Sequence, residues 1–117
     1  MDARELYRLG GEHDSAGREQ EAIPLYEQAL AAGLGEERPR ALLQLGSSLR
    51  NAGRIDEAVA LLADARREFP DFRPLRAFLA LALHSAGRTE EALAELLHAI
   101  ADEGEYERSL RAYADAL

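Results

Sequence analysis

Apolar residues recur along the chain at intervals of three and four, the spacing that places side chains on one face of an α-helix. Leu42, Leu45 and Leu49 follow this spacing. A strand would alternate apolar and polar residues, and no stretch does so for long enough to form one. The pattern therefore predicts an all-α protein. The helices are expected near 2–15, 19–32, 39–51, 55–68, 73–85, 89–102 and 105–116.

One nine-residue segment occurs three times between these helices. It is SAGREQEAI at 15–23, NAGRIDEAV at 51–59 and SAGRTEEAL at 85–93, so successive copies begin 36 and 34 residues apart. A glycine in the left-handed conformation closes a helix, and the acidic residues that follow favour the start of the next one. Each copy is therefore predicted to be a tight turn between two antiparallel helices.

The turns and the intervening Pro and Gly residues divide the chain into three helical hairpins and a seventh helix. A chain of 117 residues is expected to form one domain, here 1–117. Its repeats are expected at about 3–36, 39–72 and 73–104, followed by a C-terminal helix at 105–117. Small residues are expected where the helices of a hairpin cross closely, with Gly10, Gly46 and Ala80 facing Ala22, Ala58 and Ala92.

The middle repeat carries Leu42, Leu45-Gly46, Leu49, Ala58, Leu62, Ala65 and Pro70. This spacing resembles the 34-residue tetratricopeptide repeat, with its pattern W-x2-L-G-x2-Y, A-x3-F, A and P. The first repeat departs from the pattern at His13 and Leu34, and the third at Arg76 and Gly104. The resemblance implies a right-handed superhelix of three hairpins with a C-terminal capping helix. More narrowly, the chain is similar to small stand-alone bacterial proteins with about three such repeats.

The last predicted helix carries an apolar stripe. The stripe consists of Tyr106, Leu110, Tyr113 and Leu117. A repeat array needs a terminal element that covers the apolar flank of its last repeat, so this helix is expected to cover Leu93, Leu97 and Ile100. The alternative is that the helix docks a second subunit.

Composition and charge exclude several classes of function. The 14 basic residues are all arginine against 22 acidic residues, and the net charge of −8 argues against binding to nucleic acid or to an anionic membrane surface. Cysteine is absent, which removes disulfides and Cys-ligated metals. The N-terminus lacks signal-peptide features and no segment is long enough to span a membrane. A cytoplasmic protein is expected, and the lysine-free composition is typical of a GC-rich bacterial genome.

Residues that could carry catalysis or bind a metal do not cluster in the sequence. The histidines are His13, His84 and His98, with no pair four residues apart as a helical zinc site would need. The acidic runs fall at helix starts or in loops, where carboxylates are solvated and are favoured by the helix dipole. The sequence therefore predicts no enzyme activity, no cofactor and no metal.

The family resemblance implies that the first helix of each repeat lines a concave groove for a protein partner. The matching residues are Tyr7 and Asp14, then Arg40, Leu43, Ser47, Arg50 and Asn51, then Ala77, Leu81 and His84. Family members that grip acidic chaperone tails use a clamp of Lys, Asn and Arg. This chain has Tyr7, Gly11, Gln44, Pro74 and Phe78 at those places, so that clamp is absent.

Two functions remain open at this point. The first is a protein-interaction module or scaffold that binds a peptide or a helix in the concave groove, with a homodimer expected. The alternative is a self-assembling structural homodimer in which the groove or the C-terminal helix forms the interface. The predicted helix over 73–85 is apolar on most sides, which indicates that a partner or a second copy covers part of it.

Overall fold

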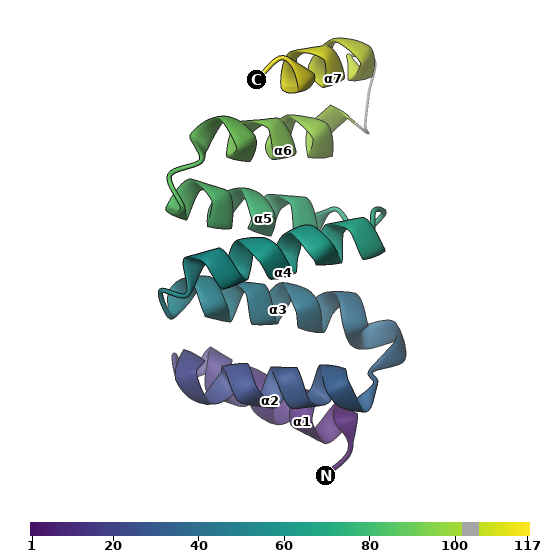
Figure 1. Cartoon of the computed structure of the whole chain (residues 1–117). Coiled ribbons are helices and arrows are strands. Elements are labelled where there is room, and N and C mark those ends of the chain that lie inside the picture. The colour runs from purple at the N-terminus through teal and green to yellow at the C-terminus, as the bar shows by residue number, and fades with distance from the viewer. Residues whose placement is uncertain (102–105) are drawn as a thin grey trace.

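The computed structural model describes residues 1–101 and 106–117. Within them the chain is helical and contains no strand, which confirms the predicted all-α class. The helices are α1 Ala3–Ser15, α2 Glu19–Ala32, α3 Arg38–Asn51, α4 Ile55–Glu68, α5 Pro74–Ser85, α6 Thr89–Ala101 and α7 Glu107–Asp115, with a short 3₁₀ helix Gly35–Glu37 before α3. They follow one another in chain order from one end of an elongated molecule to the other (Figure 1).

The helix bounds agree with the predicted ranges to within one residue at every end that the structure describes, apart from the start of α7. The predicted end of the third repeat at 104, the predicted helix end at 102 and the predicted helix start at 105 lie outside the described residues. The 3₁₀ helix was not predicted.

The repeated nine-residue segment forms the same turn three times. Gly17, Gly53 and Gly87 all have positive φ, between 77° and 84°. At the middle turn the N–H of Gly53 donates to the carbonyl of Arg50 (3.0 Å), and the N–H of Arg54 donates to that of Leu49 (2.9 Å). These nested bonds satisfy carbonyl groups that the end of a helix would otherwise leave without donors, so a local signal fixes each reversal of the chain.

Each of the first two hairpins closes on a glycine. A Cβ atom on Gly10 would lie 2.7 Å from the ring of Tyr26, and one on Gly46 would lie 2.4 Å from the Leu62 side chain. Both neighbours are completely buried. Only glycine therefore allows the two helices to approach this closely, although the nearest side chains belong to Tyr26 and Leu62 rather than to the alanines that the sequence suggested.

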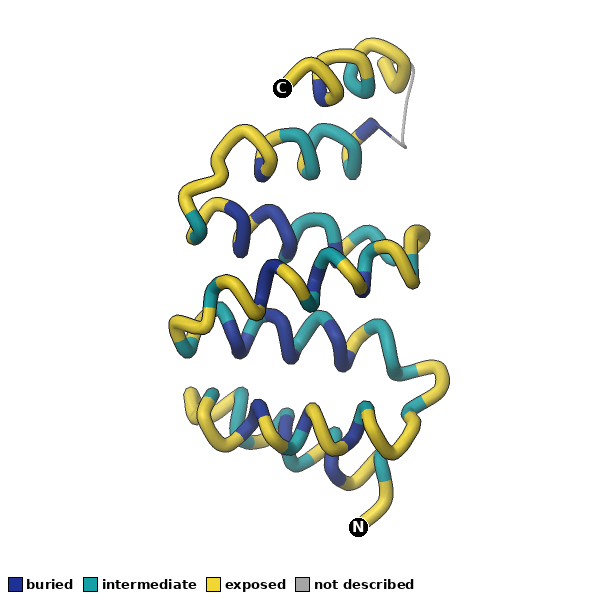
Figure 2. The backbone as a smooth tube through the Cα atoms, viewed as in Figure 1, coloured by how far each residue is buried: buried dark blue, intermediate teal, exposed yellow. Residues whose placement is uncertain are grey.

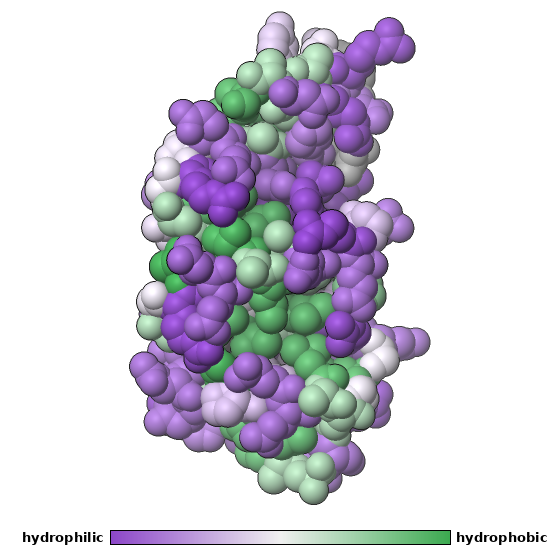
Figure 3. Space-filling model, viewed as in Figure 1, coloured by the Kyte–Doolittle hydropathy of each residue, from purple (hydrophilic) through white to green (hydrophobic). Residues whose placement is uncertain are grey.

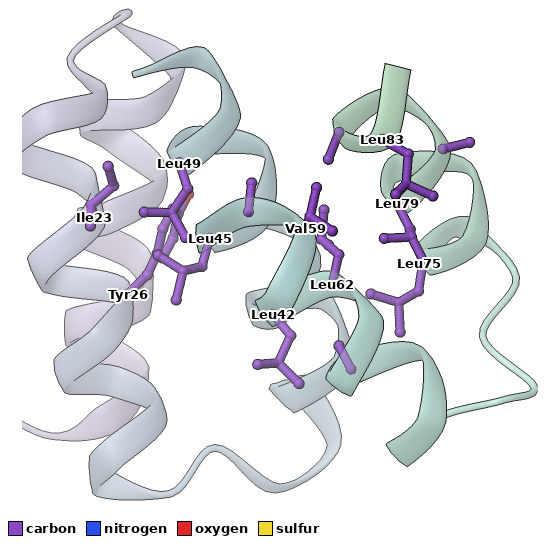
Figure 4. Close-up of a cluster of buried hydrophobic side chains, with 14 of the residues drawn as sticks. Ile23, Tyr26, Leu42, Leu45, Leu49, Val59, Leu62, Leu75, Leu79 and Leu83 are labelled. Carbon is purple, nitrogen blue, oxygen red and sulfur yellow. The ribbon is translucent and has the colours of Figure 1, made fainter. Parts of the chain in front are cut away.

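The core runs continuously through the three hairpins. In Figure 4, Val59 and Leu62 of α4 face Leu75 and Leu79 of α5, so each hairpin packs on the next. Figure 2 shows buried residues along the middle helices and exposed residues at the turns. The first helix of each new repeat thus buries the apolar flank of the repeat before it.

Helix α7 corrects one prediction. It packs against α6 and buries Ala114, yet Leu93 and Ile100 of α6 remain exposed (46% and 60%). The expectation that the last helix covers these two residues is therefore wrong, and Leu97 is half-buried. The predicted stripe is also largely open, because Tyr106, Tyr113 and Leu117 are exposed and Leu110 is half-buried.

Candidate functional site

The predicted groove residues lie on α1, α3 and α5, the first helices of the three repeats. Tyr7 of α1 is half-buried. Burial raises the pKa of its phenol, the charge of Glu37 raises it further, and Arg40 and the amide of Gln44 partly offset the rise. These influences place Tyr7 close to Arg40, so the structure brings together two predicted residues from the first and second repeats.

Arg40 and Arg50 of α3 are both held by neutral groups. The guanidinium of Arg40 lies 6.0 Å from the ring centre of Phe72, a cation–π arrangement. Arg50 donates from Nε to Oγ of Ser85 at the end of α5 (2.8 Å). The two arginines are ten residues apart on one helix, which corresponds to roughly 15 Å along its axis.

Most other arginines of the described chain pair with carboxylates. Arg38 binds Glu68 through two bonds of 2.7 and 3.0 Å, which holds the pKa of Glu68 below its ordinary value. Glu95 accepts bonds from Arg66 and Arg76 and joins α4, α5 and α6. Among the described residues, neither Arg40 nor Arg50 has a carboxylate within ion-pair distance.

Asp14 has a structural partner within its own hairpin. The phenol of Tyr26 donates to a carboxylate oxygen of Asp14 (2.9 Å). Burial, followed by this carboxylate, raises the pKa of Tyr26 well above its ordinary value. Asp14 is therefore engaged in joining α1 to α2, and it is less available to a ligand than its place in the sequence suggested.

The remaining α3 residues differ in exposure. Leu43 and Ser47 are half-buried, and Asn51 is exposed at the end of the helix. Leu43 also packs against the main core. Its apolar side chain therefore contacts the core and is also partly exposed to solvent.

The three predicted residues of α5 line one cleft. Its volume is about 550 Å³, and its lining is nearly all apolar. The lining residues are Ala77, Ala80, Leu81 and His84 of α5 with Thr89, Ala92, Leu93 and Leu96 of α6. We call this space the α5/α6 cleft. The structure does not place the predicted residues of α1 and α3 in it.

The chain matches a family model described as Tetratrico peptide repeat over residues 3–117. The chain belongs to the tetratricopeptide repeat family. Proteins of this family are in general non-catalytic repeat scaffolds that act in protein–protein interaction. A search of curated proteins finds no match to the chain.

The repeat register explains the residues that the sequence analysis missed. Leu93 and Leu96 of the third tetratricopeptide repeat lie 34 residues after Val59 and Leu62 of the second. Val59 and Leu62 are buried (8% and 0% exposed), whereas Leu93 and Leu96 are exposed (46% and 41%). The family pattern assigns such positions to the core. The sequence therefore holds no local signal that Leu93 and Leu96 are exposed in the third repeat.

The described residues hold no cluster of three or more His, Cys, Asp or Glu side chains with metal-binding geometry. No helix in the described part of the chain is both long and apolar enough to cross a membrane. Figure 3 shows hydrophilic residues around a hydrophobic area over α3 and α4. The chemistry that the structure offers is therefore apolar contact combined with guanidinium donors.

Proposed function

We propose that this tetratricopeptide repeat protein is a non-enzymatic interaction module that binds an acidic segment of a partner protein in its concave groove. One observation carries the proposal: Arg40 and Arg50, which the family resemblance assigns to the groove, have no carboxylate partners among the described residues. Guanidinium groups bind carboxylates through paired, charge-assisted hydrogen bonds. A partner that carries Asp or Glu would supply the missing acceptors.

The contacts of both arginines favour binding over a purely structural role. The Phe72 ring and the Ser85 hydroxyl orient the two guanidinium groups without neutralising their charge. Groups that are held in place before binding lose less conformational freedom when the partner arrives. The protein as a whole carries a charge of −8. These two cations would therefore also determine where on its surface an acidic segment binds.

Apolar anchors complete the proposed groove. Leu81 of α5 is 45% exposed, and Tyr7 and Leu43 are half-buried. Interaction surfaces take much of their affinity from a few apolar or aromatic side chains surrounded by polar contacts. A partner segment, whether extended or helical, would therefore combine acidic residues with at least one large apolar residue. The arginines lie outside the clamp positions of the chaperone-binding members, so the binding mode differs from theirs.

A peptide-display selection with the purified protein as bait tests this proposal. Enriched peptides should carry Asp or Glu beside an apolar residue, and their affinity should fall as salt rises, because exposed charges are screened. The double variant Arg40→Gln/Arg50→Gln should weaken binding about tenfold or more. The control Arg8→Gln/Arg67→Gln removes the same charge elsewhere and should bind normally. Enrichment without acidic residues, or equal loss in the control, would reject the proposal.

A second candidate function is self-association into a homodimer. The exposed Tyr106, Tyr113 and Leu117, on α7 and at its two ends, favour it, since an apolar stripe along a terminal helix is suited to pairing with another copy. Light scattering after size exclusion, over a hundredfold range of concentration, should then give a mass approaching twice 12.9 kDa. A constant monomer mass would exclude self-association without affecting the groove proposal.

A further inference from the structure

The α5/α6 cleft corresponds in the repeat register to a surface that is filled elsewhere in the molecule. In the second repeat, Val59 and Leu62 are covered by α5, mainly through Leu75 and Leu79 (Figure 4). The matching residues of the third repeat, Leu93 and Leu96, remain open. The cleft is therefore shaped to receive a helix with large apolar residues about four positions apart, as α5 has.

The C-terminal segment carries such residues, Tyr113 on α7 and Leu117 two residues beyond the end of that helix. Tyr113 and Leu117 lie 34 residues after Leu79 and Leu83 of α5, and Ala114 lies 34 after Ala80. Leu79 and Leu83 are buried in the core, but Tyr113 and Leu117 are exposed (69% and 52%). The apolar stripe of the C-terminal segment and the α5/α6 cleft therefore match in register, but the stripe does not lie in the cleft of its own chain.

The position of α7 within its own chain keeps both surfaces open. It lies against Ala94 and His98 of α6, and Nε2 of His98 is 3.0 Å from a carboxylate oxygen of Asp115. The residues of α4 that match this contact, Ala60 and Asp64, are exposed. With α7 packed on this flank of α6, Tyr113 and Leu117 stay exposed and no residue of α7 lines the cleft.

We propose that α7 of a second copy docks in the α5/α6 cleft, with the exchange made in both directions around a two-fold axis. A second copy joins the two surfaces without disturbing the contacts that α7 makes in its own chain, and a two-fold arrangement buries both stripes and both clefts. The proposal rests on self-association, the second candidate function, and is independent of the arginines on α3.

Site-directed cross-linking tests the arrangement directly, because the chain has no cysteine of its own. Register predicts that Tyr113 of one copy lies against Leu93 of the other, as Leu79 lies against Val59. Single variants Leu93→Cys and Tyr113→Cys, each with a different tag, are mixed and oxidised. A disulfide-linked heterodimer is expected, and no such product is expected with Ala112→Cys, which is exposed on α7 outside the stripe.

The double variant Leu93→Cys/Tyr113→Cys distinguishes docking between copies from closure within one chain. An oxidised product of monomer mass, which migrates faster on a non-reducing gel, would show that α7 moves into its own cleft and would overturn the proposal. Absence of any cross-link would overturn it as well.

A charged substitution distinguishes docking in the α5/α6 cleft from self-association through another surface. Leu93→Glu should raise the dimer dissociation constant about tenfold or more, whereas Ala60→Glu, at an exposed position of α4, should leave it unchanged. A dimer that persists with Leu93→Glu would overturn the cleft as the interface and leave self-association standing. A wild-type protein that stays monomeric would overturn both.

Discussion

At the scale of single residues, two adjacent glycines of α1 have opposite roles. Gly10 faces the fully buried ring of Tyr26, whereas a Cβ atom on Gly11 would have no atom within 4 Å. Alanine in place of a helical glycine gains about 0.5–1 kcal/mol from backbone entropy, but overpacking costs about 1–3 kcal/mol. Gly11→Ala should therefore raise the free energy of unfolding in urea, and Gly10→Ala should lower it. Equal changes in the two variants would contradict the close approach of α1 and α2.

The hydrogen bond between Tyr26 and Asp14 predicts a loss of stability at high pH. The folded-state pKa of Tyr26 lies above the ordinary value of 10.0, first because of burial and then because of Asp14. The folded protein therefore retains this proton above pH 10 while the unfolded chain releases it, so stability is complete below about pH 10 and falls as the pH rises. Tyr26→Phe should be less stable at neutral pH by about 1 kcal/mol and lose less between pH 9 and 11. Identical pH dependence in the two proteins would exclude Tyr26 as the titrating group.

At the scale of helices, the repeated turn sets the geometry of each hairpin. Gly53 has a φ of 84°, a conformation that costs a residue with a Cβ atom roughly 1–2 kcal/mol. Gly53→Ala should reduce the free energy of unfolding by about this amount, although a Cβ atom there would meet no neighbour within 4 Å. Asn tolerates the left-handed region better, so Gly53→Asn should lose less. Thermal unfolding of both variants measures the difference, and a larger loss with Asn would contradict a conformational cause.

The helices themselves could be predicted because their signals are local. The spacing of Leu42, Leu45 and Leu49, together with the glycine turns, determined where α3 begins and ends. The place of α7 could not be predicted in this way. The stripe of Tyr106, Tyr113 and Leu117 predicts an amphipathic helix. It does not predict which flank of α6 this helix packs against, because that depends on packing between elements.

The candidate site was predictable to a similar extent. Leu81 and His84 were found through the expected role of first helices, and the structure places both in one cleft. Leu93 and Leu96 were missed because their pattern is that of core residues, and only their exposure in the third repeat distinguishes them. The lack of a carboxylate partner for Arg40 among the described residues likewise becomes evident only when the partners of the other arginines are known.

At the scale of the whole molecule, the two ends of the stack differ. The outward residues of α1 include Arg4, Glu5, Arg8 and Glu12, all exposed and polar, as expected of a terminal repeat in contact with water. The opposite end exposes Leu93, Leu96 and Ile100. Among the described residues, the apolar surface that could pair lies at the α6 end, and a reciprocal contact there should give a closed dimer rather than a fibre.

Hydrogen exchange of α7 provides a test of this asymmetry in the unmodified protein. Ala114 is the one residue of α7 that is buried, so opening this helix exposes little apolar surface. The backbone amides of α7 should therefore exchange quickly in a dilute sample. If α7 docks on a second copy, its protection should increase with protein concentration, while that of α3 in the core should not change. Leu93→Glu provides the control and should remove the dependence on concentration in α7. Protection of α7 that stays low while the measured mass rises from monomer to dimer would place the interface elsewhere, because an interface that includes this helix must slow its opening in proportion to the bound fraction.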